Sequence, residues 1–552
     1  MVCNHIRFYI LLFLLLHIAT SQDPIIANVY YSRITGKFSV IKENKIDPTA
    51  AASATYYKTY ETEGWDKLQI SSYQGSDKKY QDFIKSYAMG YVEGVLTAER
   101  IYNFYQNMLH FNTIPDNTRQ FILENLEYMK TTSIKKRKID PYWDQVYNLY
   151  KQFQGMADGY NSVVDKSKRI SYVDFQLINS MSDYGDLENW KNTNARPDFS
   201  KMPAEDILDY LAFHNRCSSL IKVAPDFSDI WFGHNTWAFY SDLIRIFKEY
   251  KFKTNTGVEK SNAVAFSSYP GTISSVDDFF ILDNDLYVIE TTNNVYNIDL
   301  FKLLTPESIF TSIRAVLANR LSGSGPEWGE IFSRENSGTC NDQFQILDLK
   351  YVDLENRKIN EGALTIVEQM PGHVEIGDMT DVLKKGYWPS YNTPYFPFIR
   401  DLSGITEEIK KNETLRDGLD YDSCVRANLF RRDQGNVNSI EDYKKIIRYN
   451  DYENDPLSKG DPTKALASRY DLRKEEKSQC FGNIDAKFVS VKDTKGKKER
   501  VIYMVNGPSD DEQPSFDWTT TKCKQAKDWK PFGQVNTYNF KWIEYKTALF
   551  RD

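Results

Sequence analysis

Cysteine is the residue type in this sequence that most clearly offers chemistry. The chain has six cysteines, and Cys3 lies in an apolar leader, which leaves five in the remaining chain. An odd number in an oxidising compartment predicts a free thiol or an intermolecular bond. Cys217 is the candidate for the free thiol, because it lies where the polar stretch His214 to Arg216 gives way to the apolar run Ser218 to Ala224.

The other four cysteines allow three disulfide pairings, and the sequence does not choose between them. The pairing that we favour joins Cys340 to Cys424 and Cys480 to Cys523. Any of the five cysteines could instead be an inert buried residue.

A hairpin is predicted on the C-terminal side of Cys217. If Pro225 to Ser228 form its loop, Ala224 pairs with Asp229 and Cys217 lies opposite Thr236. Because side chains alternate along a strand, this register also determines the face of the sheet to which the cysteine side chain points.

This register makes His234 a diagonal neighbour of Cys217 on the same face, about 7–8 Å away between Cα atoms. A slip of one residue would replace it with Asn235 and Trp237. In either register, Cys217 meets a cluster of polar and aromatic side chains. His234 and Trp237 could also be ordinary sheet-packing residues.

A thiol with an unperturbed pKa near 8.5 needs a nearby base to become a nucleophile. Cleavage of the chain between Arg216 and Cys217 would supply one, because the new α-amine has a pKa of roughly 7.7–8 and sits beside the sulfur. Before cleavage, the thiol would have to attack the preceding carbonyl carbon. That step requires a strained or tightly positioned peptide bond.

Other chemistries lack their sequence patterns. The motifs G-x-S-x-G, G-x-x-x-x-G-K-[ST] and G-x-G-x-x-G are absent. The histidines form no H-E-x-x-H motif and none lies near a C-x-x-C, which disfavours a zinc site. We therefore predict no cofactor and no metal. The net charge is −7 without a long basic run, so nucleic acid is not an expected partner.

The first residues are those of a secretory signal peptide, with cleavage expected after Ser21. The predicted pieces are a signal at 1–21, an N-terminal fragment at 22–216 and a C-terminal fragment at 217–552. The two fragments are expected to form one globular unit. No later apolar run is long enough for a membrane span. We expect a secreted or lysosomal protein, glycosylated at the sequon beginning with Asn412.

The elements that must position Cys217 follow from hydrophobic periodicity. Helices are predicted over 80–109, 141–164, 206–213 and 309–321. A first strand region covers 22–60, and later strands are predicted over 218–224, 229–237, 279–282, 286–291, 344–352, 364–369, 488–491 and 501–505. The predicted class is α+β with a layered antiparallel sheet core.

Several sequence blocks resemble one family, the phospholipase B-like proteins, also called the lamina ancestor family. The blocks are Cys217-Ser-Ser-Leu-Ile-Lys, His234-Asn-Thr-Trp, Pro270-Gly-Thr-Ile-Ser-Ser-Val-Asp-Asp-Phe, Thr291-Thr-Asn-Asn, Lys385-Gly-Tyr-Trp-Pro-Ser-Tyr-Asn and Phe430-Arg-Arg-Asp-Gln-Gly. The resemblance implies the N-terminal nucleophile hydrolase fold, an αββα sandwich of two packed antiparallel sheets flanked by helices. It also implies self-cleavage before Cys217, after which the two fragments stay associated.

The resemblance also assigns roles to matching positions. Cys217 matches the nucleophile, and His234 and Trp237 match pocket residues. Thr292 and Asn293 match a strand end beside the nucleophile, where the Asn293 amide could donate to an oxyanion. Asn293 could equally be a turn residue.

The last residue to which the resemblance assigns a role is one of two adjacent arginines in the block beginning at Phe430. Arg432 matches a position that could hold a carboxylate or phosphate, and a structural ion pair with Asp433 is its alternative. Asp277 and Asp278 are interpreted as residues that end a loop, outside the site.

The leading functional hypothesis is an acyl hydrolase that deacylates phospholipids or other acylated substrates through Cys217. An amidase acting on N-acyl lipids or peptides is the close alternative. A catalytically weak lipid-binding protein on the same fold and a disulfide-linked structural glycoprotein are the non-enzymatic alternatives.

Overall fold

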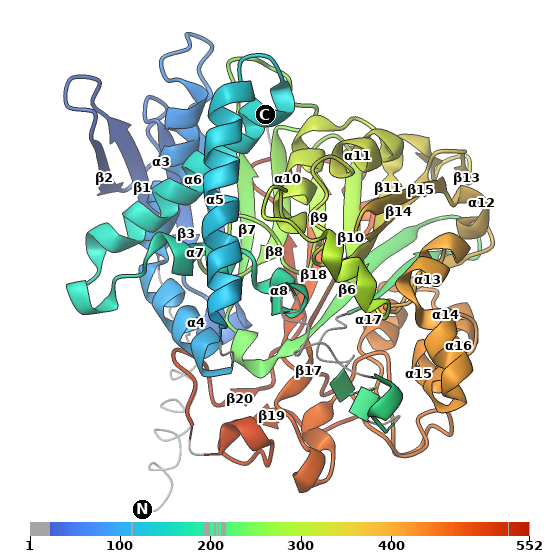
Figure 1. Cartoon of the computed structure of the whole chain (residues 1–552). Coiled ribbons are helices and arrows are strands. Elements are labelled where there is room, and N and C mark those ends of the chain that lie inside the picture. Colours follow the sequence, from blue (N-terminus) through green and yellow to red (C-terminus); the bar gives the residue numbers. More distant parts are fainter. Residues whose placement is uncertain are drawn as a thin grey trace, which may run out of the picture.

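The computed structural model describes residues 23–111, 114–188, 190, 199–203, 206–207, 209–210, 217–527 and 529–550. These residues form a mixed α+β structure with two main sheets and surrounding helices, which confirms the predicted class (Figure 1). The predicted signal peptide and Arg216 lie outside the described residues. No helix in the described ranges is long and apolar enough to cross a membrane.

The larger sheet has eleven strands, and the smaller main sheet has six. The larger one runs in the order β15 (His373–Asp378), β14 (Leu364–Met370), β11 (Asp342–Asp348), β10 (Leu286–Thr292), β9 (Phe280–Leu282), β8 (Ala263–Ser268), β7 (Arg245–Lys251), β4 (Trp65–Ser72), β3 (Ala52–Tyr57), β1 (Ile25–Tyr31) and β2 (Phe38–Glu43). The smaller one runs β16 (Tyr387–Ser390), β5 (Ser218–Val223), β6 (Ile230–Phe239), β17 (Phe481–Ser490), β18 (Val501–Asn506) and β21 (Ile543–Lys546).

The two sheets share an apolar core because alternate residues of each strand point to opposite faces. Ile230 and Phe232 of β6 enter the shared core with Ala265 of β8, whereas Trp231 packs on the outer side of the small sheet. The helices whose side chains enter the outer cores are α3 (Asp82–Leu96), α10 (Thr311–Leu321) and α11 (Gly325–Phe332) against the large sheet, and α16 (Val425–Asp433) and α17 (Ile440–Ile447) against the small sheet. The order of layers is therefore helices, sheet, sheet, helices.

The chain before Cys217 contributes β1 to β4 to the large sheet. β4 pairs with β7 in parallel, from Trp65 opposite Arg245 to Ser71 opposite Lys251, while the other described ladders are antiparallel. Figure 1 shows these blue N-terminal strands continuing into the green strands of the same sheet. The segments on either side of Cys217 are thus joined by backbone hydrogen bonds as well as by the covalent chain.

Two helices of the N-terminal part, α3 and α6 (Pro141–Val163), approach unusually closely. A Cβ atom added to Gly90 would lie 1.8 Å from the backbone oxygen of Gln152, and one added to Gly155 would lie 2.0 Å from that of Tyr87. Since such contacts are impossible for a larger side chain, glycine is required on both helices at this crossing.

Most of the predicted elements are present. The region 80–109 is divided between α3 and α4 (Ala98–Phe111), and 141–164 is α6. The predicted pairs correspond to β9 with β10, β11 with β14 and β17 with β18. Half of the predicted helix over 206–213 lies outside the described residues.

The cysteines correct one prediction. Cys480 and Cys523 form a disulfide, as expected, but Cys340 and Cys424 are both free and buried, so the pairing of these two is wrong. Cys340 lies just before β11, with its sulfur 3.7 Å from a carboxyl oxygen of Asp342, whereas Cys424 precedes α16 in the outer core of the small sheet. The two thiols belong to different layers of the fold.

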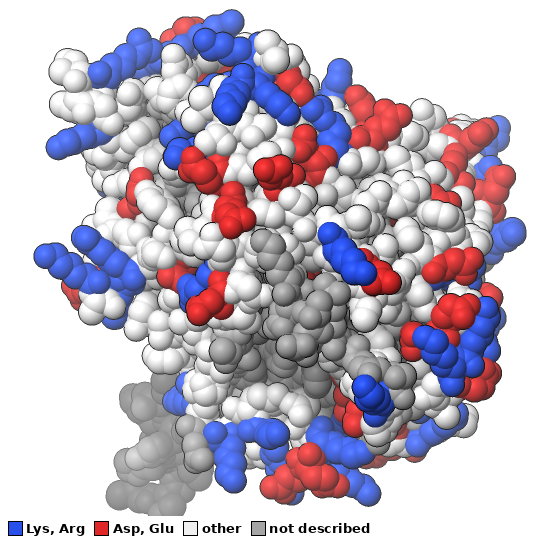
Figure 2. Space-filling model, in the orientation of Figure 1, with Lys and Arg blue, Asp and Glu red and all other residues white. Residues whose placement is uncertain are grey.

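Charged side chains of both signs are interspersed over the molecular face drawn in Figure 2. This distribution agrees with the mixed charge pattern of the sequence.

Candidate active site

Cys217 lies immediately before β5, at the end of the small sheet. It is free, only 1% exposed, and has a backbone φ of 98°. A positive φ is unfavourable for any residue with a Cβ atom, and such strain is often found at functional sites. The residue with the strained backbone, Cys217, directly follows the peptide bond that was predicted to be cut.

The hairpin that carries Cys217 has the predicted register. Ser218 lies opposite Asn235, and the N–H of Ala224 donates to the carbonyl of Asp229 over 2.9 Å. Continuing this ladder by one residue places Cys217 opposite Thr236, so the alternative with a one-residue slip is wrong.

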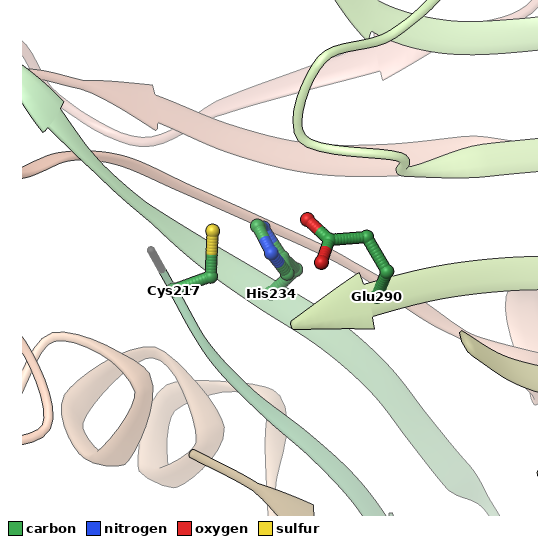
Figure 3. A group of neighbouring side chains, drawn as sticks. All are labelled: Cys217, His234 and Glu290. Atoms are coloured by element: carbon green, nitrogen blue, oxygen red, sulfur yellow. The ribbon is translucent and has the colours of Figure 1, made fainter. Parts of the chain in front are cut away.

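Three side chains, one directly before β5 and one each on β6 and β10, converge at this point (Figure 3). The thiol of Cys217, a ring nitrogen of His234 on β6 and a carboxyl oxygen of Glu290 on β10 lie within 4.8 Å of one another. Because β10 belongs to the large sheet, the site lies between the two sheets. Among the described residues, this is the one His, Cys, Asp and Glu group with the spacing to hold a metal ion.

Burial favours the neutral form of all three groups. Burial, and next the charge of Glu290, raises the pKa of the Cys217 thiol well above its ordinary value. Burial, and next the charge of Lys487, lowers the pKa of His234 well below its ordinary value. The pKa of Glu290 is raised first by burial and then by the neighbouring carboxyls Asp342 and Asp278. The thiol is therefore not activated while the chain is uncut.

Several polar atoms of this site are buried without a partner. Within the described ranges, both ring nitrogens of His234 and the Oε2 atom of Glu290 lack a hydrogen bond of ordinary geometry, although the ring approaches the backbone of Glu290 and the Glu290 carboxyl approaches that of Asp342. Buried polar atoms are normally satisfied, and exceptions call for an explanation such as a catalytic role or a ligand.

The side-chain amide of Asn293 is also buried without a partner among the described residues. Asn293 directly follows β10, and its own N–H donates to the carbonyl of Asn341 over 2.6 Å. The backbone is thus held while the amide is left available to bind an oxygen atom. The carbonyl of neighbouring Thr292 accepts a hydrogen bond of 2.7 Å from Asn392 Nδ2.

An arginine that the sequence did not single out holds the nucleophile residue. Arg426 on α16 donates through Nη1 to the Cys217 carbonyl over 2.8 Å and through Nη2 to the Tyr391 carbonyl over 2.7 Å. Its guanidinium carbon lies 4.5 Å from the centroid of the Trp237 ring. Trp237 is therefore brought to the site as predicted, packed against a cation.

Arg432, the arginine predicted to bind a carboxylate or phosphate, is not placed beside Cys217. Its side chain is 42% exposed, and its guanidinium pairs with Asp433 over 2.7 Å and with Asp455 over 2.7 Å. The structure therefore shows the ion-pair alternative, and it is Arg426, six positions earlier, that reaches the nucleophile.

Asn235 fixes the end of the hairpin. Its Oδ1 accepts from the N–H of Ser218 over 3.2 Å and from Nε1 of Trp237 over 2.9 Å. Its amide donates to the carbonyls of Ile447 and Leu466. One buried asparagine thus ties β5 and β6 to the outer segments of the fold.

Asp277 does more than end a loop, which corrects the interpretation made from the sequence. It forms buried ion pairs with Arg245, over 2.7 Å, and with Lys487, and it accepts a hydrogen bond of 3.1 Å from Thr236. Lys487 and Arg245 also pair with Asp485. Burial opposes ionisation of Asp277, but the two cations hold its pKa well below the usual range. This charge-balanced network lies next to His234.

Sequence reasoning missed Glu290 and Arg426, and it interpreted Asp277 only as the end of a loop, for one common reason. Carboxylates and arginines are numerous in the chain, and these three are distant in sequence from Cys217. Glu290 lies one residue before the sequence block that begins at Thr291, and Arg426 lies four residues before the block that begins at Phe430. This proximity to the blocks was the one sequence signal that could have pointed to these two residues.

The structure brings a buried thiol, imidazole and carboxyl together between two packed sheets. Comparison with known proteins places the chain in the class of lipid hydrolases. The family model described as Phospholipase B matches residues 52–545. The chain therefore belongs to the phospholipase B family, as the resemblance in its sequence blocks predicted.

Relatives from distant organisms match nearly the full chain. Phospholipase B-like protein B of Dictyostelium discoideum is 36% identical over 94% of this chain and 89% of the relative. Phospholipase B of Crotalus adamanteus is 34% identical over 96% and 94%, and Phospholipase B-like 1 of Homo sapiens is 34% identical over 97% and 94%.

Proposed function

We propose that the protein is an acyl hydrolase that deacylates phospholipids through Cys217, after the chain has cut itself between Arg216 and Cys217. Membership of the phospholipase B family supports the reaction class. The layered arrangement of helices, sheet, sheet and helices is consistent with an N-terminal nucleophile hydrolase sandwich, which the proposal requires.

The observation that carries the proposal is the conformation of Cys217. A buried cysteine with a φ of 98° stores strain about its N–Cα bond, while Arg426 holds its carbonyl. Backbone strain of this kind costs of order 1–3 kcal/mol. An N-terminal residue has no φ restraint, so cleavage before Cys217 would relieve that strain.

In the cleavage step, the sulfur attacks the carbonyl carbon of residue 216. A sulfur–carbon bond forms, the carbon–nitrogen bond to Cys217 breaks, and the thiol proton passes to the departing amine. Water then hydrolyses the thioester and restores the thiol. The shared β4–β7 ladder would keep the two fragments together.

In the catalytic step, the new α-amine of Cys217 acts as the base for its own thiol. The thiolate attacks the ester carbonyl of the lipid, and the Asn293 amide donates to the oxyanion that develops. The alkoxide leaves with a proton, and water hydrolyses the acyl-enzyme to a free fatty acid. His234 and Trp237 form the adjacent wall of the pocket.

A secreted or lysosomal location is part of the proposal. The Cys480–Cys523 disulfide is typical of proteins from oxidising compartments. Asn412 is only partly buried, and the N–H of Thr414 donates to its side-chain oxygen over 3.2 Å. The sequon therefore lies at the surface, where a glycan can be attached.

The test is to purify the protein and follow both processing and turnover. We expect two fragments on a denaturing gel, with the larger beginning Cys217-Ser218-Ser219, and an uncut Cys217→Ala variant. A mass-resolved substrate panel should show fatty acid release from phosphatidylcholine. A wild-type chain that stays whole at acid pH and releases no fatty acid would favour the lipid-binding alternative instead.

The strained backbone of Cys217 keeps the amidase as a second candidate. The bond before Cys217, which the proposed self-cleavage would break, is itself an amide. If N-acyl amides in the panel were hydrolysed while phosphatidylcholine was not, the amidase would replace the phospholipase.

A further inference from the structure

We propose that the mature site is also a binding site for a thiophilic divalent cation of the zinc class, held by the thiolate and α-amine of Cys217 together with His234 and Glu290. The ion would block the nucleophile reversibly. The inference rests on the proposed cleavage for its amine ligand, and its other three ligands are present in the uncut chain.

The first support is the spacing of the donors. The three ligand atoms lie within 4.8 Å of one another, one directly before β5 and one each on β6 and β10 (Figure 3). Zinc bound at roughly 2.0–2.3 Å in a tetrahedral site places its ligand atoms about 3.3–3.7 Å apart. Side-chain movements on the order of 1 Å would therefore close the group around an ion.

The second support is that the donors are buried and poorly satisfied. Both nitrogens of His234 and Oε2 of Glu290 lack a hydrogen bond of ordinary geometry in the described part of the chain, although the ring approaches the backbone of Glu290 and the carboxyl approaches that of Asp342. An ion would satisfy them. A structural histidine in a sheet core normally has at least one of its nitrogens hydrogen-bonded.

The third support is the chemistry that cleavage adds. An α-amine and a thiolate on the same cysteine form a five-membered chelate ring with a metal ion. With imidazole and carboxylate they make a four-coordinate set of one sulfur, two nitrogens and one oxygen, all ligand types that zinc accepts. The sequence disfavoured zinc because no local motif brings these donors together.

The charges balance when the ion enters. A divalent cation displaces one proton from the thiol and one from the Glu290 carboxyl and binds the α-amine in its neutral form, which leaves a neutral complex; a third proton is released when the amine starts as ammonium. The nearby cations Arg245 and Lys487 are already neutralised by Asp277 and Asp485. They therefore add no net positive charge against a metal ion.

The functional consequence is inhibition by competition for the sulfur. A thiolate bound to the ion cannot attack a carbonyl carbon, and the chelated amine cannot act as a base. Chelators should then activate protein that has been isolated with metal.

The test measures binding directly on the cleaved two-fragment protein. After treatment with EDTA, the protein is dialysed against zinc or cobalt, and the bound metal is counted by mass spectrometry. We expect one ion per chain, and a thiolate-to-metal charge-transfer band with cobalt. His234→Gln and Glu290→Gln should each weaken binding by at least about 10–100-fold.

A matched control is Cys424→Ala, which removes another buried free thiol and should leave metal binding unchanged. Circular dichroism and the melting temperature verify that each variant is folded. Absence of stoichiometric metal on the wild type, or equal binding by the folded His234→Gln and Glu290→Gln variants, would overturn the proposal.

The same measurement separates this inference from the proposed function. If the chain were never cut, the gel would show it, and metal bound by the whole chain through Cys217, His234 and Glu290 would still support the three side-chain ligands. If the protein were cut and hydrolysed lipid but bound no metal, only the metal inference would fail.

Discussion

Two buried polar groups lie side by side between the sheets, and they are built in opposite ways. Around Asp277, two carboxylates are matched by two cations, Arg245 and Lys487. Around Cys217, the thiol, His234 and Glu290 form no ion pair with any described residue, and polar atoms of His234 and Glu290 lack hydrogen bonds of ordinary geometry, as do some atoms of Arg245 and Asp485 in the first group.

The difference indicates that the Asp277 group stabilises the fold and that the Cys217 group is the candidate site for chemistry. A buried charge without its partner costs several kcal/mol, so a charge-balanced network holds the fold only as long as it is complete. Unpaired buried polar atoms lower stability and persist where a substrate, a transition state or an ion will satisfy them. Substitutions in the two groups should therefore affect different measurements.

The largest effect is expected for Cys217→Ala. Removal of the nucleophile should abolish the split into fragments and reduce kcat/KM by roughly 10⁴-fold or more. The melting temperature should change little, since no ion pair is lost. Cys424→Ala is the control, because it removes a buried thiol elsewhere. A Cys217→Ala chain that still split would remove Cys217 from the mechanism.

Asp277→Asn should have the largest effect on stability. It leaves Arg245 and Lys487 buried with one carboxylate fewer, so the free energy of unfolding should fall by about 3–5 kcal/mol. Denaturant or thermal unfolding measures this loss. Asp226→Asn is the surface control, since its side chain is 53% exposed and pairs with Arg357 at 3.7 Å. An unchanged unfolding midpoint for Asp277→Asn would contradict the structural role of the network.

Asn293→Ala should behave in the opposite way. Because its amide has no partner in the described structure, its loss should leave the melting temperature nearly unchanged. If the amide stabilises the oxyanion, kcat should fall about 10²–10³-fold. Asn356→Ala, at an exposed turn, serves as the control. A loss of stability with unaltered kcat would instead make Asn293 a structural residue.

The smallest effect is a pH dependence of stability from further unbalanced carboxyls. Burial raises the pKa of both Asp183 and Asp186 to about 7. The folded state therefore binds more protons than the unfolded state between about pH 4 and pH 7, and stability falls as the pH rises through that window. The melting temperature should be a few degrees higher at pH 5 than at pH 8.

Asp183→Asn combined with Asp186→Asn should flatten this pH profile, because the asparagine amides do not titrate. A melting temperature that rises between pH 5 and pH 8 in the wild type would contradict the raised pKa values.

The sequence predicted the nucleophile hairpin well because the hairpin is local. Ala224 and Asp229 are separated by one short loop, and alternation of apolar residues specifies which face each side chain takes. The sequence could not decide between the two roles considered for Arg432, and the predicted Cys340–Cys424 pair is wrong. The choice between Arg426 and Arg432 depends on how α16 docks, and the two cysteines lie in separate layers.

By itself, the sequence determined the α+β class, the family, the position of Cys217 and its register with His234. Only the tertiary structure decided that Glu290 joins them, that Arg426 holds the Cys217 carbonyl and that Asp277 belongs to a balanced network. The physical reason is that strand pairing within a hairpin is encoded by neighbouring residues. The packing of one sheet on another brings together residues far apart in the chain, and no local pattern records that contact.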